Sequence, residues 1–388
     1  EITLPLAPTG GVDIDMAQPA DLSGTDAANP PDMTTRDLRT PVATIGSGTF
    51  GQAADLCWNG SFLFVTDRNN NKLHAFTPAA LTNNGALPVA TLQYADPSDA
   101  MPARTTFAVP IGLWCDSQGL LLADSGGHRV LYFAGANLTA TSKATGVFGQ
   151  DTLVAGLPAN RGMPNPNNLS LRTPYGVHYD GTTLYIADRN NHRVLGVPVL
   201  RSQMANLSAR AATTRLGQAQ FTTGNSGMGN NGLNGPESVA VDPISGQLAV
   251  SDSGNNRVAI FATPQVLADG TSANLVAALG QPGLGTNAAG VGAAQLRNPT
   301  ITRGLDGQIF VSDFGNNRLQ IVSGGLPMTS GVSATETVGP DTPAMAGMDS
   351  VIKPGGMLVV SNAMGTFLLV VHAGSPAKQS AVLVYRLR

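Results

Sequence analysis

One pattern of apolar and polar positions recurs five times along the chain. In each copy an apolar strand ends in Asp, a polar turn rich in Asn or Gly follows, and an Arg or Lys opens a second apolar strand. The copies span residues 64–72, 122–129, 185–193, 249–257 and 310–318. Two short apolar runs joined by such turn residues are typical of a β-hairpin. Because the Asp residues return at intervals of 57 to 64 positions, the pattern predicts a repeat protein.

A further short apolar segment follows each hairpin and predicts the fourth strand of each unit. These segments are residues 89–92, 144–150, 213–218, 276–281 and 335–339, and a sixth copy at 42–46 precedes the first hairpin. A sixth set of strands is expected at 357–360, 367–371 and 381–385, where His372 stands near the Asp position. An unpaired outer strand would leave an exposed edge. We therefore expect residues 42–46 to pair with 381–385 and close a ring.

The D-x-x-N-N-R turn resembles the NHL repeat family over roughly residues 41–388. This resemblance implies an all-β, six-bladed β-propeller made of four-stranded antiparallel blades. The repeat spacing is longer than usual, so an inserted loop is expected before several blades, for example at 151–173, 219–235 and 282–298. Long loops on a rigid scaffold commonly carry function, although these could instead serve only to pack neighbouring blades together.

Residues 1–40 differ from the rest of the chain because they are rich in Asp, Pro, Ala and small polar residues. Such a segment buries too little apolar surface to fold, so we expect a flexible tether before a propeller at 41–388. It resembles the spacers of bacterial surface lipoproteins, which implies a lipid anchor upstream and a periplasmic, cell-surface or secreted location. The alternative is an ordinary mobile N-terminus. No run of eighteen apolar residues is present, so no transmembrane segment is predicted.

The composition bears on partners and cofactors. Charged residues make up 12% of the chain and the formal net charge is −3, which argues against nucleic-acid binding, including the RNA binding known for some NHL propellers. Cys57 and Cys115 are too few for a zinc cluster. They are expected on the inner strands of adjacent blades, one position apart in the repeat. A contact between them, with or without a disulfide, is left open.

The histidines invite comparison with the peptidyl amidating lyases, which share this repeat type and bind zinc. His128 and His192 occupy the turn position that Asn256 and Asn317 occupy elsewhere, and no three histidines share a repeat position. A zinc site needs three converging ligands. The turn Asp and Arg residues are interpreted as structural. We therefore expect no metal site, no cofactor and no catalytic residue.

The residue after the Pro that opens each innermost strand should lie near the ring axis. In chain order these residues are Ala54, Ile111, Tyr175, Glu237, Thr300 and Gly355. Gluconolactonase-like propellers hold calcium there with an acidic cluster, whereas this set has a single carboxylate, and calcium prefers six to eight oxygens. Tyr175 and Glu237 are predicted instead to hold a small polar ligand.

Three arginines complete the predicted ligand-binding set: Arg68 and Arg189 in the turns, and Arg161 in the insert at 151–173. The predicted function is an extracytoplasmic binding or scaffold module that presents one loop-rich face to a protein, peptide or glycan. The alternative is a hydrolase or lyase acting at the axial funnel, although the sequence favours a protein that is not an enzyme. It does not decide the oligomeric state.

Overall fold

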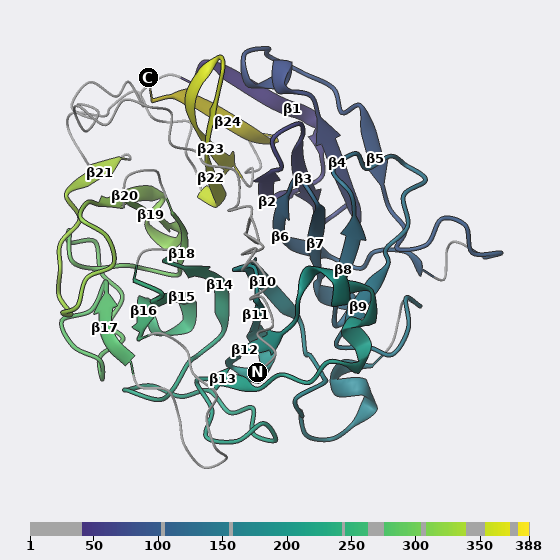
Figure 1. Ribbon diagram of the computed structural model, residues 1–388. Coiled ribbons are helices and arrows are strands. Elements are labelled where there is room, and N and C mark those ends of the chain that lie inside the picture. Colours follow the sequence, from purple (N-terminus) through teal and green to yellow (C-terminus); the bar gives the residue numbers. More distant parts are fainter. Residues whose placement is uncertain are drawn as a thin grey trace, which may run out of the picture. The chain divides into compact units, whose positions relative to one another are not determined.

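The computed structural model describes residues 41–101, 105–154, 158–242, 245–262, 275–303, 308–338, 354–372 and 379–387. Six four-stranded antiparallel sheets form the blades of a ring (Figure 1). The predicted six-bladed β-propeller is therefore confirmed. The predicted tether at 1–40 lies outside the described residues. Within the described ranges, no helix has the length and apolar character needed to cross a membrane.

Each blade begins with an innermost strand, which opens with a Pro in every blade except the first, and ends with an outer strand. Blade 1 consists of β2 (Ala53–Trp58), β3 (Leu63–Asp67), β4 (Lys72–Phe76) and β5 (Ala90–Leu92). Blade 2 consists of β6 (Pro110–Asp116), β7 (Gly119–Asp124), β8 (Arg129–Ala134) and β9 (Gly146–Phe148). Blade 3 consists of β10 (Pro174–Tyr179), β11 (Thr183–Asp188), β12 (Arg193–Pro198) and β13 (Thr214–Leu216).

The remaining blades follow the same order, except that the last blade takes its outer strand from the other end of the propeller sequence. Blade 4 consists of β14 (Pro236–Val241), β15 (Leu248–Asp252), β16 (Arg257–Phe261) and β17 (Leu275–Leu279). Blade 5 consists of β18 (Pro299–Arg303), β19 (Ile309–Asp313), β20 (Arg318–Val322) and β21 (Glu336–Val338). Blade 6 consists of β22 (Pro354–Asn362), β23 (Gly365–His372), β24 (Ser380–Arg386) and β1 (Ala43–Phe50).

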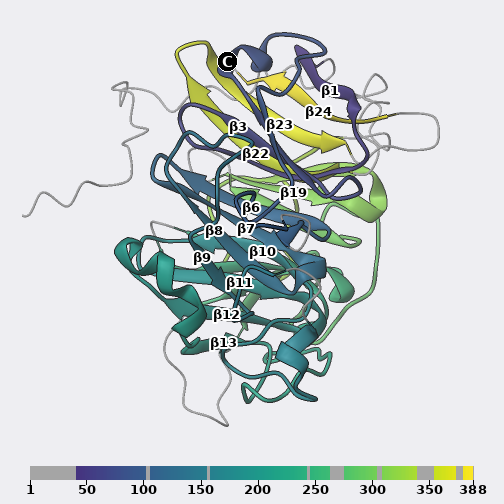
Figure 2. The ribbon, with the colours of Figure 1, turned by 90° about the vertical axis from the view of Figure 1, so that its right-hand side faces the viewer.

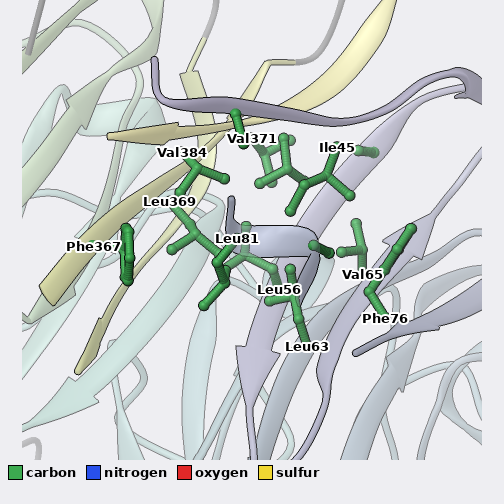
Figure 3. Packing of buried hydrophobic residues seen from close by; sticks show 14 of the residues in the cluster. Ile45, Leu56, Leu63, Val65, Phe76, Leu81, Phe367, Leu369, Val371 and Val384 are labelled. Carbon is green, nitrogen blue, oxygen red and sulfur yellow. The ribbon is translucent and has the colours of Figure 1, made fainter. Parts of the chain in front are cut away.

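Ring closure by β1 occurs as predicted. This strand pairs antiparallel with β24, so that Ala43 faces Val384 and Ile45 faces Val382. Figures 1 and 2 show the purple strand β1 beside the yellow strand β24. Side chains of blade 6 and blade 1 then share one buried apolar cluster, part of which appears in Figure 3. Closure therefore completes both a sheet and a core.

The strands are buried on both faces because each blade packs against two neighbours. In β7, Leu120 and Leu122 contact the cluster shared with blade 1, whereas Leu121 and Ala123 contact the cluster shared with blade 3. Successive side chains of a strand point to opposite faces, which explains this division. It also explains why the middle strands are almost continuously apolar instead of alternating with polar residues.

Blades 1 and 2 are covalently joined. Cys57 of β2 and Cys115 of β6 form a disulfide, with their Cα atoms 5.8 Å apart. The sequence had left both the contact and the bond open, and the structure contains both.

Candidate functional site

The Asp that ends the second strand of a blade organises the turn after it. In blade 3, one Asp188 oxygen accepts a hydrogen bond from the backbone N–H of Arg172 at 2.7 Å. The other oxygen accepts from Arg193 Nε and Asn191 Nδ2, both at 2.8 Å. Asp188 and Arg193 have fully buried side chains. Equivalent buried Asp–Arg pairs occur in three other blades, namely Asp124–Arg129, Asp252–Arg257 and Asp313–Arg318. These residues are structural, as the sequence indicated.

The remaining guanidinium nitrogens of these arginines bind the inserts. Arg193 Nη1 donates to the carbonyl of Phe221 at 2.6 Å, and its Nη2 donates to that of Asn167 at 2.9 Å. Arg257 Nη2 likewise donates to the carbonyl of Gly232 at 2.8 Å. The turns and the inserts therefore lie together on one side of the ring, as expected. We call this side the insert face: the turns that follow β3, β7, β11, β15 and β19, with the described residues of 151–173, 219–235 and 282–298.

A second recurring contact joins each turn to the next blade. His128 Nδ1 accepts from the backbone N–H of Thr173, and His192 Nδ1 accepts from that of Gly235, both at 3.0 Å. Asn256 Oδ1 plays the same part for Asn298 at 3.1 Å. Burial lowers the pKa of both histidines, which favours the neutral ring that this acceptor role requires. The two histidines thus act as turn residues equivalent to Asn.

Three of the predicted ligand-binding residues meet near the ring axis. Arg189 is the first residue of the 3₁₀ turn η6 (Arg189–Asn191), whereas Tyr175 and Glu237 are the second residues of inner strands β10 and β14. Arg189 Nε lies 3.2 Å from Glu237 Oε1, and its guanidinium carbon lies 4.7 Å from the centre of the Tyr175 ring. All three side chains are half-buried.

Arg68 occupies the repeat position of Arg189 in blade 1, because it directly follows Asp67 at the end of β3. The inner strands contact one another in the order β2, β6, β10, β14, β18, β22 and back to β2, so β14 lies opposite β2. Burial raises the pKa of Glu237, whereas Arg189, Ser253 and Arg68 lower it. The positive charge of Arg68 favours the ionised Glu237 carboxyl, and the buried Nε of Arg68 makes no hydrogen bond in the described part of the chain. We call Arg68, Tyr175, Arg189 and Glu237 the axial cluster.

Arg161 is not part of this cluster. Its Nη1 pairs with Asp151 at 2.7 Å, and its Nη2 donates to the carbonyl of Ser208 at 3.3 Å. The guanidinium therefore ties the insert to itself and to η7 (Arg201–Ala209). Nothing in the repeat pattern signals this arrangement, because Asp151 is replaced by Ala219 and Pro282 in the corresponding positions of the other inserts.

Two charged residues that the sequence analysis did not select also have special surroundings. Burial raises the pKa of Asp55 in β2 to about 7, although the backbone amides of Leu113 and Leu56 donate to it. The Arg201 guanidinium lies over the rings of Trp114 and Tyr179, which contact each other edge to face, and it pairs with Asp116. Within the described ranges, no group of three or more His, Cys, Asp or Glu residues is placed to hold a metal ion.

Comparisons with known proteins agree with the repeat assignment. Residues 233–261, which include the turn and the Asp–Arg pair of blade 4, match the NHL repeat family. No curated protein matches the chain.

Several solved structures resemble the chain. It is similar to a streptogramin B lyase, with 12% identity, coverage of 87% of this chain and 84% of that chain, and a TM-score of 0.44. It is also similar to a candidate gluconolactonase, with 12% identity, coverage of 89% and 92%, and a TM-score of 0.48. A candidate 6-phosphogluconolactonase from Bacteroides uniformis has 13% identity, coverage of 73% and 68%, and a TM-score of 0.40. With its recurring Asp–Arg turns and a direct match in blade 4, the chain is a six-bladed β-propeller that carries the NHL repeat.

Proposed function

We propose that the chain is an extracytoplasmic binding or scaffold module that presents its insert face to a protein, peptide or glycan. The main support is that the inserts are held rigidly by buried arginines while they expose apolar side chains. Met163, Met228 and Val291 lie at matching points of three successive inserts and are 57%, 50% and 65% exposed. Each follows a glycine, and the carbonyls of Gly227 and Gly290 accept hydrogen bonds from turn asparagines.

These exposed side chains favour a protein partner within the proposed classes. A single exposed apolar residue is ordinary, but repeated exposure on one face is typical of interaction surfaces. The backbone that carries these side chains is held by hydrogen bonds from buried arginines and turn asparagines. Little conformational entropy would therefore be lost when a partner binds. The Cys57–Cys115 disulfide supports an oxidising compartment, since such bonds persist mainly outside the cytosol. The lipid anchor and the tether remain part of the same proposal.

Site-specific photo-crosslinking in the native host tests this function. A photoreactive residue at Met163 or Met228 should give a discrete crosslinked species. The same residue at Ser61 or Thr182, both exposed in turns at the other end of the blades, should give none. Replacing Met163, Met228 and Val291 with Ser should then remove the species obtained from a photoreactive residue at Asn165. Crosslinks that arise only from Ser61 or Thr182 would place the partner on the opposite face and refute the proposal.

The alternative proposal, a hydrolase or lyase at the ring axis, is supported by Glu237. Burial raises the pKa of this carboxyl, which is the direction expected of a general acid, and Arg189 lies beside it. The decisive measurement is turnover. A ligand bound at the axis should be converted by the unmodified protein and not by a Glu237→Gln variant, whereas a binder releases its ligand unchanged.

A further inference from the structure

The axial cluster carries unbalanced positive charge. Arg68 and Arg189 contribute two cations, and Glu237 contributes one carboxylate. Arg189 uses Nε for Glu237 and Nη1 for Asn190, so its Nη2 makes no hydrogen bond to a described residue. The side chain of Arg68 donates none to the described part of the chain, and its Nε is buried. A buried donor without an acceptor is destabilising, so an acceptor supplied by a ligand would be favoured here.

We propose that the axial cluster binds a carboxylate group of the ligand, between Arg68 and Arg189. The guanidinium fork matches the two oxygens of a carboxylate, and the free nitrogens of both arginines are available donors. One carboxylate balances the charge of the cluster. A phosphate dianion would place a second negative charge beside Glu237, and a neutral ligand would leave the excess positive charge of the cluster uncompensated.

This inference deepens the proposed function, since it names the chemical group that the insert face recognises at its centre. Tyr175 has a positioning role here, because its ring supports one face of the Arg189 guanidinium. Glu237 fixes the Nε edge of the same guanidinium and so aims the other edge at the ligand. The carboxylate could belong to an acidic side chain of a peptide or to a uronic acid.

Binding of matched small probes tests the inference directly. One pair is N-acetyl-glutamate amide and N-acetyl-glutamine amide, and the other is methyl glucuronide and methyl glucoside. Within each pair only the charged group differs. Titration followed by NMR should show saturable binding of the acid in at least one pair and none of its neutral partner, and the pair that binds identifies a peptide or a glycan source. Raising the salt concentration should weaken this binding.

Substitutions distinguish recognition by the cluster from general attraction. Arg68→Gln and Arg189→Gln should each weaken binding at least about tenfold, as expected for loss of a charge-assisted hydrogen bond. Glu237→Gln should tighten it, because a repelling charge is removed, and this opposite sign is not expected of a merely structural residue. Arg210→Gln, between η7 and β13 and outside the insert face, is the matched control and should have no effect. Equal binding of acid and neutral probes, no binding of either acid, or an unchanged affinity in Arg68→Gln would overturn the inference. Crosslinking at Met163 would remain informative about the proposed function in each case.

Discussion

The turn between the second and third strands is stabilised differently in blades 2 to 5 than in blades 1 and 6. In the first group a fully or almost fully buried Arg pairs with Asp and binds insert carbonyls. In blade 1 only Gly51 and Gln52 separate β1 from β2, so no insert precedes the blade. Lys72 takes the Arg position there and is half-buried, and Asp67 lies 3.7 Å from His74 Nε2.

Blade 6 has lost both members of the pair. His372 and Ala381 face each other where Asp and Arg stand elsewhere, and the Ser380 hydroxyl donates to the carbonyl of His372 at 3.0 Å. A buried charge without its partner is strongly destabilising, which explains why blade 6 has lost the Asp as well as the Arg. Blade 1 teaches that the Arg of the repeat is dispensable in a blade that no insert precedes.

The largest effect is expected from removing β1. The described residues of blade 6 form no buried ion pair, and the blade depends on this strand for its outer edge and for Ile45 in the core shared with blade 1. Deleting residues 1–50 should therefore lower the melting temperature sharply, whereas deleting residues 1–35 should barely change it. Thermal denaturation of the two truncated proteins makes the comparison. Equal melting temperatures would contradict the closure of blade 6 by β1.

Next in size is the loss of one buried arginine. Arg193→Met leaves Asp188 charged, buried and unpaired, and it frees the insert carbonyls, so the free energy of unfolding should fall by roughly 3–5 kcal/mol. Lys72→Met in blade 1 should change it by less than about 0.5 kcal/mol. Denaturant unfolding of both variants measures the difference. Similar losses would show that the position matters for a reason common to all blades.

Breaking the disulfide should have a smaller effect. Blade 1 lacks the ion pair and is bonded to blade 2 through Cys57 and Cys115. The Cys57→Ala, Cys115→Ala protein should lose about 2–4 kcal/mol of stability, since the crosslink restricts the unfolded chain. Denaturant unfolding of both proteins gives the value, and mass measurement after alkylation, with and without reductant, verifies the bond. Two free thiols in protein from an oxidising compartment would contradict the disulfide.

The smallest effect concerns pH. The folded state lowers the pKa of His128 and His192, so below pH about 6.5 the unfolded chain binds protons that the folded chain resists. Stability is therefore lost as the pH falls, by at most about 1.4 kcal/mol per pH unit for each histidine. Asp188, Arg172 and, for His192, Arg189 also face these rings.

Replacing both histidines with Asn, the residue of blades 4 and 5, should remove part of this loss. The double variant and the unmodified protein should have similar melting temperatures at pH 8, and the variant should melt higher at pH 5.5. Parallel pH profiles would mean that the histidines do not titrate in this range. The measurement compares a histidine nitrogen with an asparagine oxygen as the acceptor of the same backbone hydrogen bond between neighbouring blades.

Much of the fold was predictable because each structural feature recurs in several copies of the sequence repeat. The Asp–Arg turns, the outer strands and the closing strand all follow from alignment of the copies. The places of Tyr175, Glu237, Arg68 and Arg189 near the axis follow from the same register. Their role in ligand binding stays a proposal.

What the sequence did not indicate depends on contacts that occur once. Arg161 was predicted to bind ligand from its place in an insert, and the sequence did not indicate that its guanidinium pairs with Asp151. The contact of Arg201 with the rings of Trp114 and Tyr179 joins η7 to the inner strands of two blades. The buried carboxyl of Asp55 is also specific to one blade. The equivalent repeat position is Gly in three other blades, at Gly112, Gly176 and Gly356.

The way in which the arginines hold the inserts has a consequence for evolution. Arg193, Arg257 and Arg318 contact backbone carbonyls of the inserts, which every amino acid supplies. Mutation can therefore exchange residues such as Met163 or Met228 without disturbing the anchoring below them. A lineage built on this plan can change what it recognises while its scaffold stays constant. For the same reason, these loops are natural positions for a randomised library.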